Sequence, residues 1–209
     1  MWQPSSGEAG RSFRLADRDY PCIIHGAEKS GASFFTIALT ADLVRQGQPV
    51  VFICAKSAGV LALQRELELL APGVKTKEIG SQTAAQLEEH QLVTIFSHRP
   101  ADILVHLRAL HDWAERVMVI KNIDTLLTPG VWATVQSHRQ LILSGDVAST
   151  SAPILERNFR SSIAFSKWPA GWLDIRQPLP TYAGEYRHGK IVKQVFLSED
   201  QQSSARVDK

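Results

Sequence analysis

Cysteine and long hydrophobic runs are both scarce in this chain. Its 209 residues include two cysteines, Cys22 and Cys54, each inside a short apolar stretch. Their spacing fits no metal-binding motif, so we expect buried, reduced thiols. No apolar run approaches the roughly 20 residues that a membrane-spanning helix needs. The first 19 residues also lack the hydrophobic segment of a secretory signal, and we therefore expect a cytoplasmic protein without a membrane span.

An excess of charge of one sign is missing as well. Lysine and arginine number 23 against 21 acidic residues, which gives a formal net charge of +2. That balance is too mild to indicate nucleic-acid binding by itself. The seven histidines show no spacing typical of a metal site, so no metal is expected. The length suffices for one substantial core and is short for two domains.

Short apolar runs of strand length alternate with amphipathic stretches of helical length. The runs are 22–25, 50–54, 92–96, 117–120, 141–144 and 162–166. The helical stretches are 32–47, 57–73, 99–115 and 129–139. Strands that are apolar throughout belong to sheets covered on both faces. The alternation therefore predicts a three-layer α/β domain with a mostly parallel sheet.

The C-terminal part of the chain follows another pattern. Residues 181–198 read as two extended runs around "RHGK", which predicts a β-hairpin. The polar stretch 199–209 predicts a disordered tail, and residues 1–19 a flexible N-terminal segment. The domain itself is expected to span residues 20–198.

A glycine-containing loop connects the first predicted strand to the first predicted helix. Residues 25–33, "HGAEKSGAS", nearly match the phosphate-binding pattern G-x-x-x-x-G-K-[ST], through Gly26, Gly31 and Ser33. In such a loop, backbone N–H groups and the helix N-terminus hold phosphates, the serine holds Mg²⁺, and the lysine reaches the outer phosphates. Here Ala32 stands at the lysine position.

With this loop in its strand–loop–helix context, the chain resembles the RecA/KaiC-like branch of the P-loop NTPases over residues 20–198. "VVFICAKSAGV" is similar to the second β-α unit of that branch, with Lys56 at the position of a catalytic glutamate. "VMVIKNIDTLL" is similar to the Walker B strand, with Lys121 at the position of the metal-associated aspartate and Asp124 three residues on.

The resemblance also implies a further strand, "LILSGDV", whose polar tip senses the γ-phosphate through Ser144 or Asp146. Phosphoryl transfer needs cations on the phosphates and acidic groups that hold Mg²⁺ or orient water. Three departures, at Ala32, Lys56 and Lys121, oppose that chemistry together. We therefore expect a catalytically degenerate domain that works by binding, as an assembly or regulatory subunit through protein–protein contacts or as a homo-oligomer.

Other functions stay open at this point. Lys29 lies inside the loop and is able to replace the missing lysine, in which case the chain would be an ATPase with Asp124 or Asp146 near the metal. Alternatively the loop and the lysines form a site for a nucleotide or another anion without Mg²⁺. The candidate residues for that site are Gly26, Lys29, Ser30, Gly31, Ser33, Lys56, Lys121 and Asp146.

Basic and aromatic residues are interleaved between 156 and 172. Arg157, Arg160, Trp168 and Trp172 are candidates for a protein interface or for contact with nucleic acid. A purely structural alternative is that the tryptophans pack against the end of the strand 162–166. We expect Trp2 and Trp132 to be exposed as well, which favours a partner surface.

Overall fold

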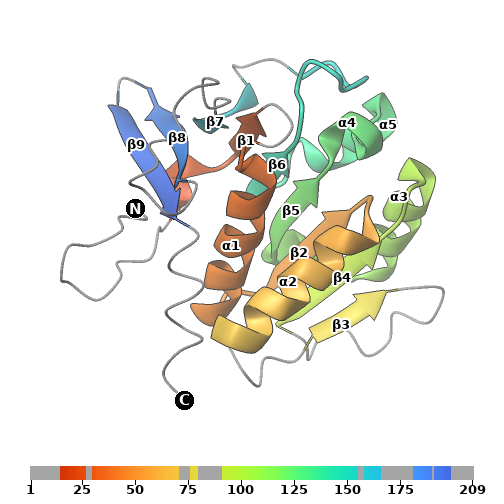
Figure 1. The fold of residues 1–209 in the computed structure, drawn as a ribbon. Helices are drawn as coiled ribbons and strands as arrows, with labels where there is room; N and C mark the ends of the chain where they lie inside the picture. The colour runs from red at the N-terminus through yellow and green to blue at the C-terminus, as the bar shows by residue number, and fades with distance from the viewer. Residues whose placement is uncertain are drawn as a thin grey trace.

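The computed structural model describes residues 15–26, 30–70, 76–79, 91–154, 158–165, 181–189 and 191–198. Within these residues nine strands form a single sheet in the order β3-β4-β2-β5-β6-β1-β7-β8-β9 (Figure 1). The strands are β1 (Cys22–Gly26), β2 (Val50–Cys54), β3 (Thr76–Ile79), β4 (Leu92–Phe96), β5 (Val117–Lys121), β6 (Leu141–Ser144), β7 (Ser161–Phe165), β8 (Thr181–His188) and β9 (Ile191–Ser198).

The sheet is parallel from β3 through β7 and antiparallel at its other edge. Each neighbouring pair from β3 to β7 runs in the same direction. β8 and β9 pair antiparallel with β7 and with each other, so the predicted C-terminal hairpin is confirmed. One strand, β6, lies between β1 and β5. The carboxyl ends of β1, β6, β5 and β2 therefore come together at one edge.

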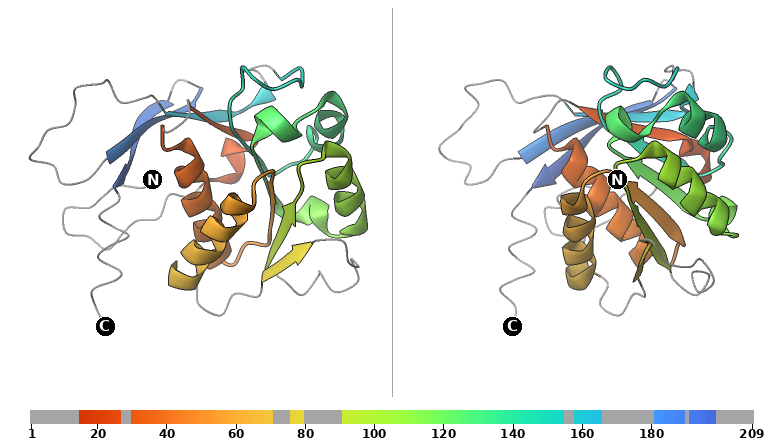
Figure 2. Two further views of the ribbon diagram at one scale, coloured as in Figure 1. Left: turned by 45° about the vertical axis from the view of Figure 1, so that its right-hand side comes forward. Right: turned by 90° about the vertical axis from the view of Figure 1, so that its right-hand side faces the viewer.

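Helices cover both faces of the sheet, so the predicted three-layer α/β architecture is confirmed. α1 and α2 pack on one face and α3, α4 and α5 on the other, each over its own apolar core (Figure 2). The helices are α1 (Ala32–Arg45), α2 (Ser57–Leu70), α3 (Pro100–Ala109), α4 (Ile123–Leu126) and α5 (Pro129–Val135), with 3₁₀ turns η1 (Asp17–Asp19) and η3 (Trp113–Glu115). No helix in the described part of the chain is long and apolar enough to cross a membrane.

Local sequence signals account for the ends of these helices. Gly47 has φ +83° and ends α1, because its N–H donates to the Val44 carbonyl while Gln48 N–H donates to Leu43. Thr128 caps α5 by accepting from Val131 N–H at 3.4 Å, with Pro129 as the first helical residue. These two ends lie where the sequence predicted them.

Three expectations from the sequence need correction. The helix predicted over 99–115 ends at Ala109, and its last part forms the 3₁₀ turn η3. Trp132, expected to be exposed, is 6% exposed, because it packs into the core beneath α5 against Phe159. The short strand β3 was not predicted.

Residues 15–19, which the sequence placed in a flexible segment, belong to the packed domain. Leu15 is buried in the core below α1, and the Asp19 carboxylate is also buried. Asp19 accepts a 2.8 Å hydrogen bond from the Tyr186 hydroxyl of β8 and another of 2.8 Å from Ala16 N–H. The carboxylate thus joins η1 to the C-terminal hairpin.

Candidate functional site

The glycine loop follows β1 at the carboxyl edge of the sheet and leads directly into α1. Gly26 ends the strand in close contact with β7, since a Cβ built there would lie 2.7 Å from the Phe165 carbonyl oxygen. Gly31 caps α1 with φ +95°, a conformation that favours glycine. Ser30 between them is buried, and its hydroxyl has no hydrogen-bond partner among the described residues. Lys29 lies outside the described residues.

The first turns of α1 are fixed to β6 by a pair of hydroxyl groups. Thr36 Oγ1 lies 2.6 Å from Ser144 Oγ, at the end of β6, and donates to the Ala32 carbonyl at 2.8 Å. Ser144, which resemblance linked to γ-phosphate sensing, is therefore buried and already bonded to α1. Ala32 is buried as well, whereas Ser33 is exposed. The serine of the motif remains accessible, but the lysine position faces the interior.

Lys121 ends β5 and is buried, not a solvated residue at the sheet edge. It is 6% exposed and pairs in register with Cys54 of β2 and with Ser144 of β6. Its aliphatic stem reaches α2, since Cδ lies 3.8 Å from a Cβ built on Gly59. Burial lowers the pKa of the Lys121 ammonium below its usual 10.5, and the neighbouring Cys54 opposes that shift.

Cys54 and Asn122 complete the surroundings of Lys121, and sequence reasoning had not linked either to the site. The Cys54 thiol lies 3.2 Å from the Lys56 carbonyl oxygen and 3.3 Å from Asn122 Oδ1. Burial raises the pKa of the thiol, so Cys54 is neutral at pH 7. Asn122 has φ +64°, which turns the chain from β5 into α4. Asparagine adopts a positive φ more readily than most residues, so an asparagine directly after the apolar strand is the sequence signal for this turn.

Two carboxylates follow the strands at this edge, and both are exposed. Asp124 lies in α4, beside the loop after β6, since a Cβ built on Gly145 would be 3.0 Å from Asp124 Oδ1. Asp146 accepts hydrogen bonds from Ser149 Oγ at 2.6 Å and from Ala148 N–H at 3.0 Å. These bonds hold the pKa of Asp146 below its usual value. No group of three metal-ligating side chains exists among the described residues.

The described candidate residues other than Asp146 lie in three places. The loop and its flanks hold Gly26, Ser30, Gly31 and Ser33. Lys56 follows β2 and Lys121 ends β5, and the two are near enough to each other to interact electrostatically. Lys56 itself is exposed. Arg160 directly precedes β7 and therefore lies at the amino ends of the parallel strands, away from the loop. Arg157, Trp168 and Trp172 fall outside the described residues.

Comparison with known proteins identifies the fold. No protein-family model matches the chain, and no curated protein matches it by sequence. Among solved structures, it resembles the genome packaging NTPase B204 from Sulfolobus turreted icosahedral virus 2. For the complex of B204 with AMP, the TM-score is 0.57 at 14% identity, over 85% of this chain and 96% of that one.

The complex of the same NTPase with AMPPCP gives a similar result. The TM-score is 0.56 at 15% identity, over 86% of this chain and 97% of B204. At such identity the likeness establishes the arrangement of the elements and not the activity. The described chain is an α/β domain with the mostly parallel sheet and covering helices of the P-loop NTPase fold.

Proposed function

We propose that this domain has lost nucleotide hydrolysis and acts by binding, as an assembly or regulatory subunit whose main contacts are with protein. The observation that carries the proposal is the buried Lys121 at the end of β5. The RecA/KaiC-like resemblance assigns that position to the metal-associated aspartate. Lys121 lies between its register partners Cys54 and Ser144 on the neighbouring strands, and its side chain extends to the place that the missing Cβ of Gly59 leaves open.

An amine at this position does not serve a magnesium ion. Mg²⁺ prefers hard oxygen ligands in octahedral geometry, and neither an ammonium nor a neutral amine supplies one. The nearest carboxylate on the chain, Asp124, is exposed in α4 instead of buried at the strand end. Asp146 already accepts two hydrogen bonds from its own loop. Neither acid replaces the missing ligand by its position.

The residues that would contact the phosphates also favour a loss of hydrolysis. Ala32 stands where the motif has the lysine that neutralises the outer phosphates, and this alanine is buried. Lys56 stands where the resemblance places a glutamate, so the general base of that site is missing. Loss at three positions with different chemical tasks favours a domain kept for its surface and shape. Protein contacts are then the simplest remaining use of the fold.

A second function is favoured by one observation at the loop: binding of a nucleotide or another anion without Mg²⁺. The Ser30 hydroxyl is buried and has no partner among the described residues. No side chain caps the N-terminus of α1, whose free N–H groups attract anions. Lys56, which is exposed after β2, would add positive charge near this end of the sheet. We propose that ligand binding at this site regulates the subunit.

Thermal-shift titration of the full chain with ATP, ADP and GTP, with and without Mg²⁺, separates these functions. A ligand that binds only the native state raises the unfolding midpoint by mass action. We expect no Mg²⁺-dependent shift; a Mg²⁺-independent shift identifies the metal-free site. Ser33→Glu, which places a carboxylate at the exposed first turn of α1, must abolish that shift.

Size-exclusion chromatography with light scattering then tests the assembly function, on the chain alone and with partners captured from its source. A self-associated or partner-bound chain without turnover agrees with the proposal. A Mg²⁺-dependent shift accompanied by phosphate release contradicts it, and Lys29→Ala then shows whether Lys29 carries the activity.

A further inference from the structure

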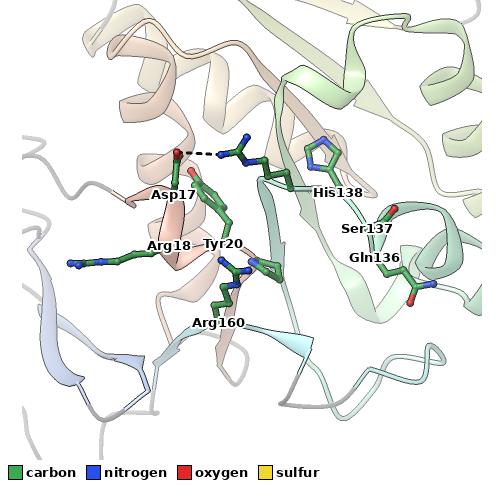
Figure 3. Close-up of a pocket in the computed structure, with 9 residues that line it drawn as sticks. Asp17, Arg18, Tyr20, Gln136, Ser137, His138 and Arg160 are labelled. Carbon is green, nitrogen blue, oxygen red and sulfur yellow. Dashed lines mark ion pairs between the residues drawn. The ribbon is translucent and has the colours of Figure 1, made fainter.

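A polar pocket of about 510 Å³ opens at the amino ends of the parallel strands, whereas the glycine loop lies at their carboxyl ends (Figure 3). It lies where β6, β1 and β7, three neighbouring strands, begin. Its lining residues are Asp17, Arg18, Tyr20, Pro21, Gln136, Ser137, His138, Arg139 and Arg160. β1 runs from this pocket to the loop over five residues, which separates the two by about 13 Å.

Positive charge predominates on the walls of this pocket. The lining includes three guanidinium groups, those of Arg18, Arg139 and Arg160, and a single carboxylate, that of Asp17. The one ion pair among them, from Arg139 to Asp17, is loose at 3.7 Å, with the two side chains 83% and 73% exposed. An exposed pair of this kind contributes little to stability and gives way readily to a stronger anion. Among the described residues, Arg18 and Arg160 form no ion pair within 4 Å.

The histidine in the pocket adds no charge. His138 Nε2 donates to the Trp113 carbonyl at 3.0 Å, and Nδ1 accepts from Gln140 N–H at 3.2 Å. Burial lowers the pKa of the ring, which keeps it neutral. Because both ring nitrogens are occupied, His138 shapes the wall and leaves recognition to the arginines. The net charge of the lining is therefore +2, from three guanidinium groups and one carboxylate.

Backbone bonds hold the wall that carries Arg160 in place. Arg160 N–H donates to the Pro21 carbonyl at 2.9 Å, and Ser161 Oγ donates to the Asp19 carbonyl at 2.6 Å. In Figure 3 the Arg160 side chain reaches toward Tyr20, whereas Arg18 extends away from it. The Tyr20 hydroxyl is buried without a hydrogen-bond partner among the described residues. Burial raises its pKa, so the hydroxyl keeps its proton and remains a donor.

We propose that this pocket binds a small phosphomonoester, with its dianionic phosphate held by Arg139 and Arg160. A guanidinium group donates two parallel hydrogen bonds to phosphate oxygens, and two such groups match a dianion in charge. The ligand would displace Asp17 from Arg139, and Arg18 at the rim would add to the attracting field. A cavity of about 510 Å³ accommodates a phosphate together with a small organic group. This binding site is independent of the glycine loop and of its degeneration.

The alternative occupant of a basic surface, single-stranded nucleic acid, fits the geometry less well. Nucleic acid is bound along an extended groove that tracks several phosphates, with aromatic side chains on which bases stack. Here the three arginines line one pocket, and its aromatic residues, Tyr20 and His138, are 3% and 6% exposed. A single phosphate is therefore favoured over a chain of them.

Isothermal titration calorimetry of the full chain with inorganic phosphate and with AMP tests the proposal. We expect saturable binding of both, weakened about tenfold by Arg160→Ala and further by Arg139→Ala/Arg160→Ala. Asp17→Asn should tighten binding, because it removes the competing carboxylate. All of these side chains are exposed, so the variants keep the fold. AMP should bind more weakly as the pH falls below about 6, where its phosphate becomes a monoanion.

Controls at the opposite edge distinguish this pocket from the glycine loop. Ser33→Glu and Lys56→Ala alter the loop edge and must leave phosphate binding at the pocket unchanged. Loss of binding in Ser33→Glu with retention in Arg160→Ala would assign the ligand to the loop and overturn the proposal. The absence of saturable binding by millimolar phosphate and AMP would overturn it too. Tight, steeply salt-dependent binding of a 20-nucleotide single strand, without binding of AMP, would replace it with a nucleic-acid surface.

Discussion

Cys54 and Lys121 are register partners at the carboxyl ends of β2 and β5, and burial moves their pKa values in opposite directions. The thiol becomes harder to ionise and the ammonium easier to deprotonate, so both side chains are driven toward their neutral forms. Gly59 permits this pairing, because a Cβ there would lie 2.5 Å from the Cys54 sulfur. The carboxyl ends of β2 and β5 are therefore filled by a low-charge, closely packed group.

Lys121→Met should raise the free energy of unfolding at pH 7 by about 1 kcal/mol, because it removes the cost of burying an amine and keeps most of the volume. The sign of this stability difference and the pH range in which it changes follow from the lowered pKa of Lys121. Between the folded-state pKa and 10.5 the unfolded chain binds more protons, so wild-type stability from this group rises with pH. The advantage of Lys121→Met should therefore shrink toward pH 10. Urea unfolding of both proteins at neutral and alkaline pH measures it.

Lys56→Met is the matched control, since Lys56 is exposed one strand away. It should change stability by no more than about 0.5 kcal/mol. A loss of more than 1 kcal/mol in Lys121→Met would mean that the ammonium has a specific partner at this edge.

Thr36→Val should destabilise the domain by about 1 to 2 kcal/mol, because the buried Ser144 hydroxyl loses its 2.6 Å partner while the shape is kept. Adding Ser144→Ala should cost less than the sum of the two single changes, since the orphaned hydroxyl disappears. Thr134→Val is the control: Thr134 bonds the Gly130 carbonyl four residues back, as Thr36 bonds Ala32, but it is at the surface. Urea unfolding of Thr36→Val, Ser144→Ala, the double variant and Thr134→Val measures these losses. Additive losses at Thr36 and Ser144 would argue against a hydrogen bond between the two hydroxyl groups.

The strands and the order of the elements could be predicted because the sheet is buried on both faces. β2 is buried at all five positions and β6 at all four, so each appears in the sequence as a continuous apolar run. β3 gives no such signal: its sequence, Thr-Lys-Glu-Ile, is polar, and it pairs only at the edge of the sheet. A run of charged residues at an edge cannot be told from a loop by periodicity.

The candidate site was predictable in position but not in environment. In the structure Gly26 ends β1 and Gly31 precedes α1, on either side of the loop that the motif indicated, and Lys56 and Lys121 lie near each other. Burial of Lys121 could not be inferred, because it depends on the side-chain direction at the last residue of β5 and on the absence of a Cβ at Gly59. The arginine pocket was also out of reach, since Arg18, Arg139 and Arg160 are far apart in sequence and meet only through the β6-β1-β7 order.

The free energy of unfolding should fall as the pH drops below about 6.5, in part because of His138. Its pKa is lowered by burial, so the unfolded chain takes up a proton on this ring before the folded one does. Protonation of Nδ1 would also break its acceptor bond with Gln140 N–H. Urea unfolding between pH 7 and 5 should show a shallower loss in His138→Gln than in the wild type. His111→Gln, at an exposed position, should leave the slope unchanged.

Ala32→Lys restores the loop lysine and should not create ATPase activity. Under the proposed assignment, Lys121 still stands at the position of the metal ligand and Lys56 at that of the general base, so the loop lysine alone does not complete the site. A phosphate-release assay with Mg²⁺-ATP should give the same background for the wild type and the single variant. Unfolding in urea checks that the longer side chain at this buried position has not disrupted α1. Adding Lys121→Asp and Lys56→Glu is the matched restoration, and turnover, where it returns at all, should need these acids. Robust turnover by Ala32→Lys alone, at about 1 s⁻¹ as in ordinary enzymes, would contradict the roles proposed for Lys56 and Lys121. The loss of hydrolysis would then rest on the loop lysine alone.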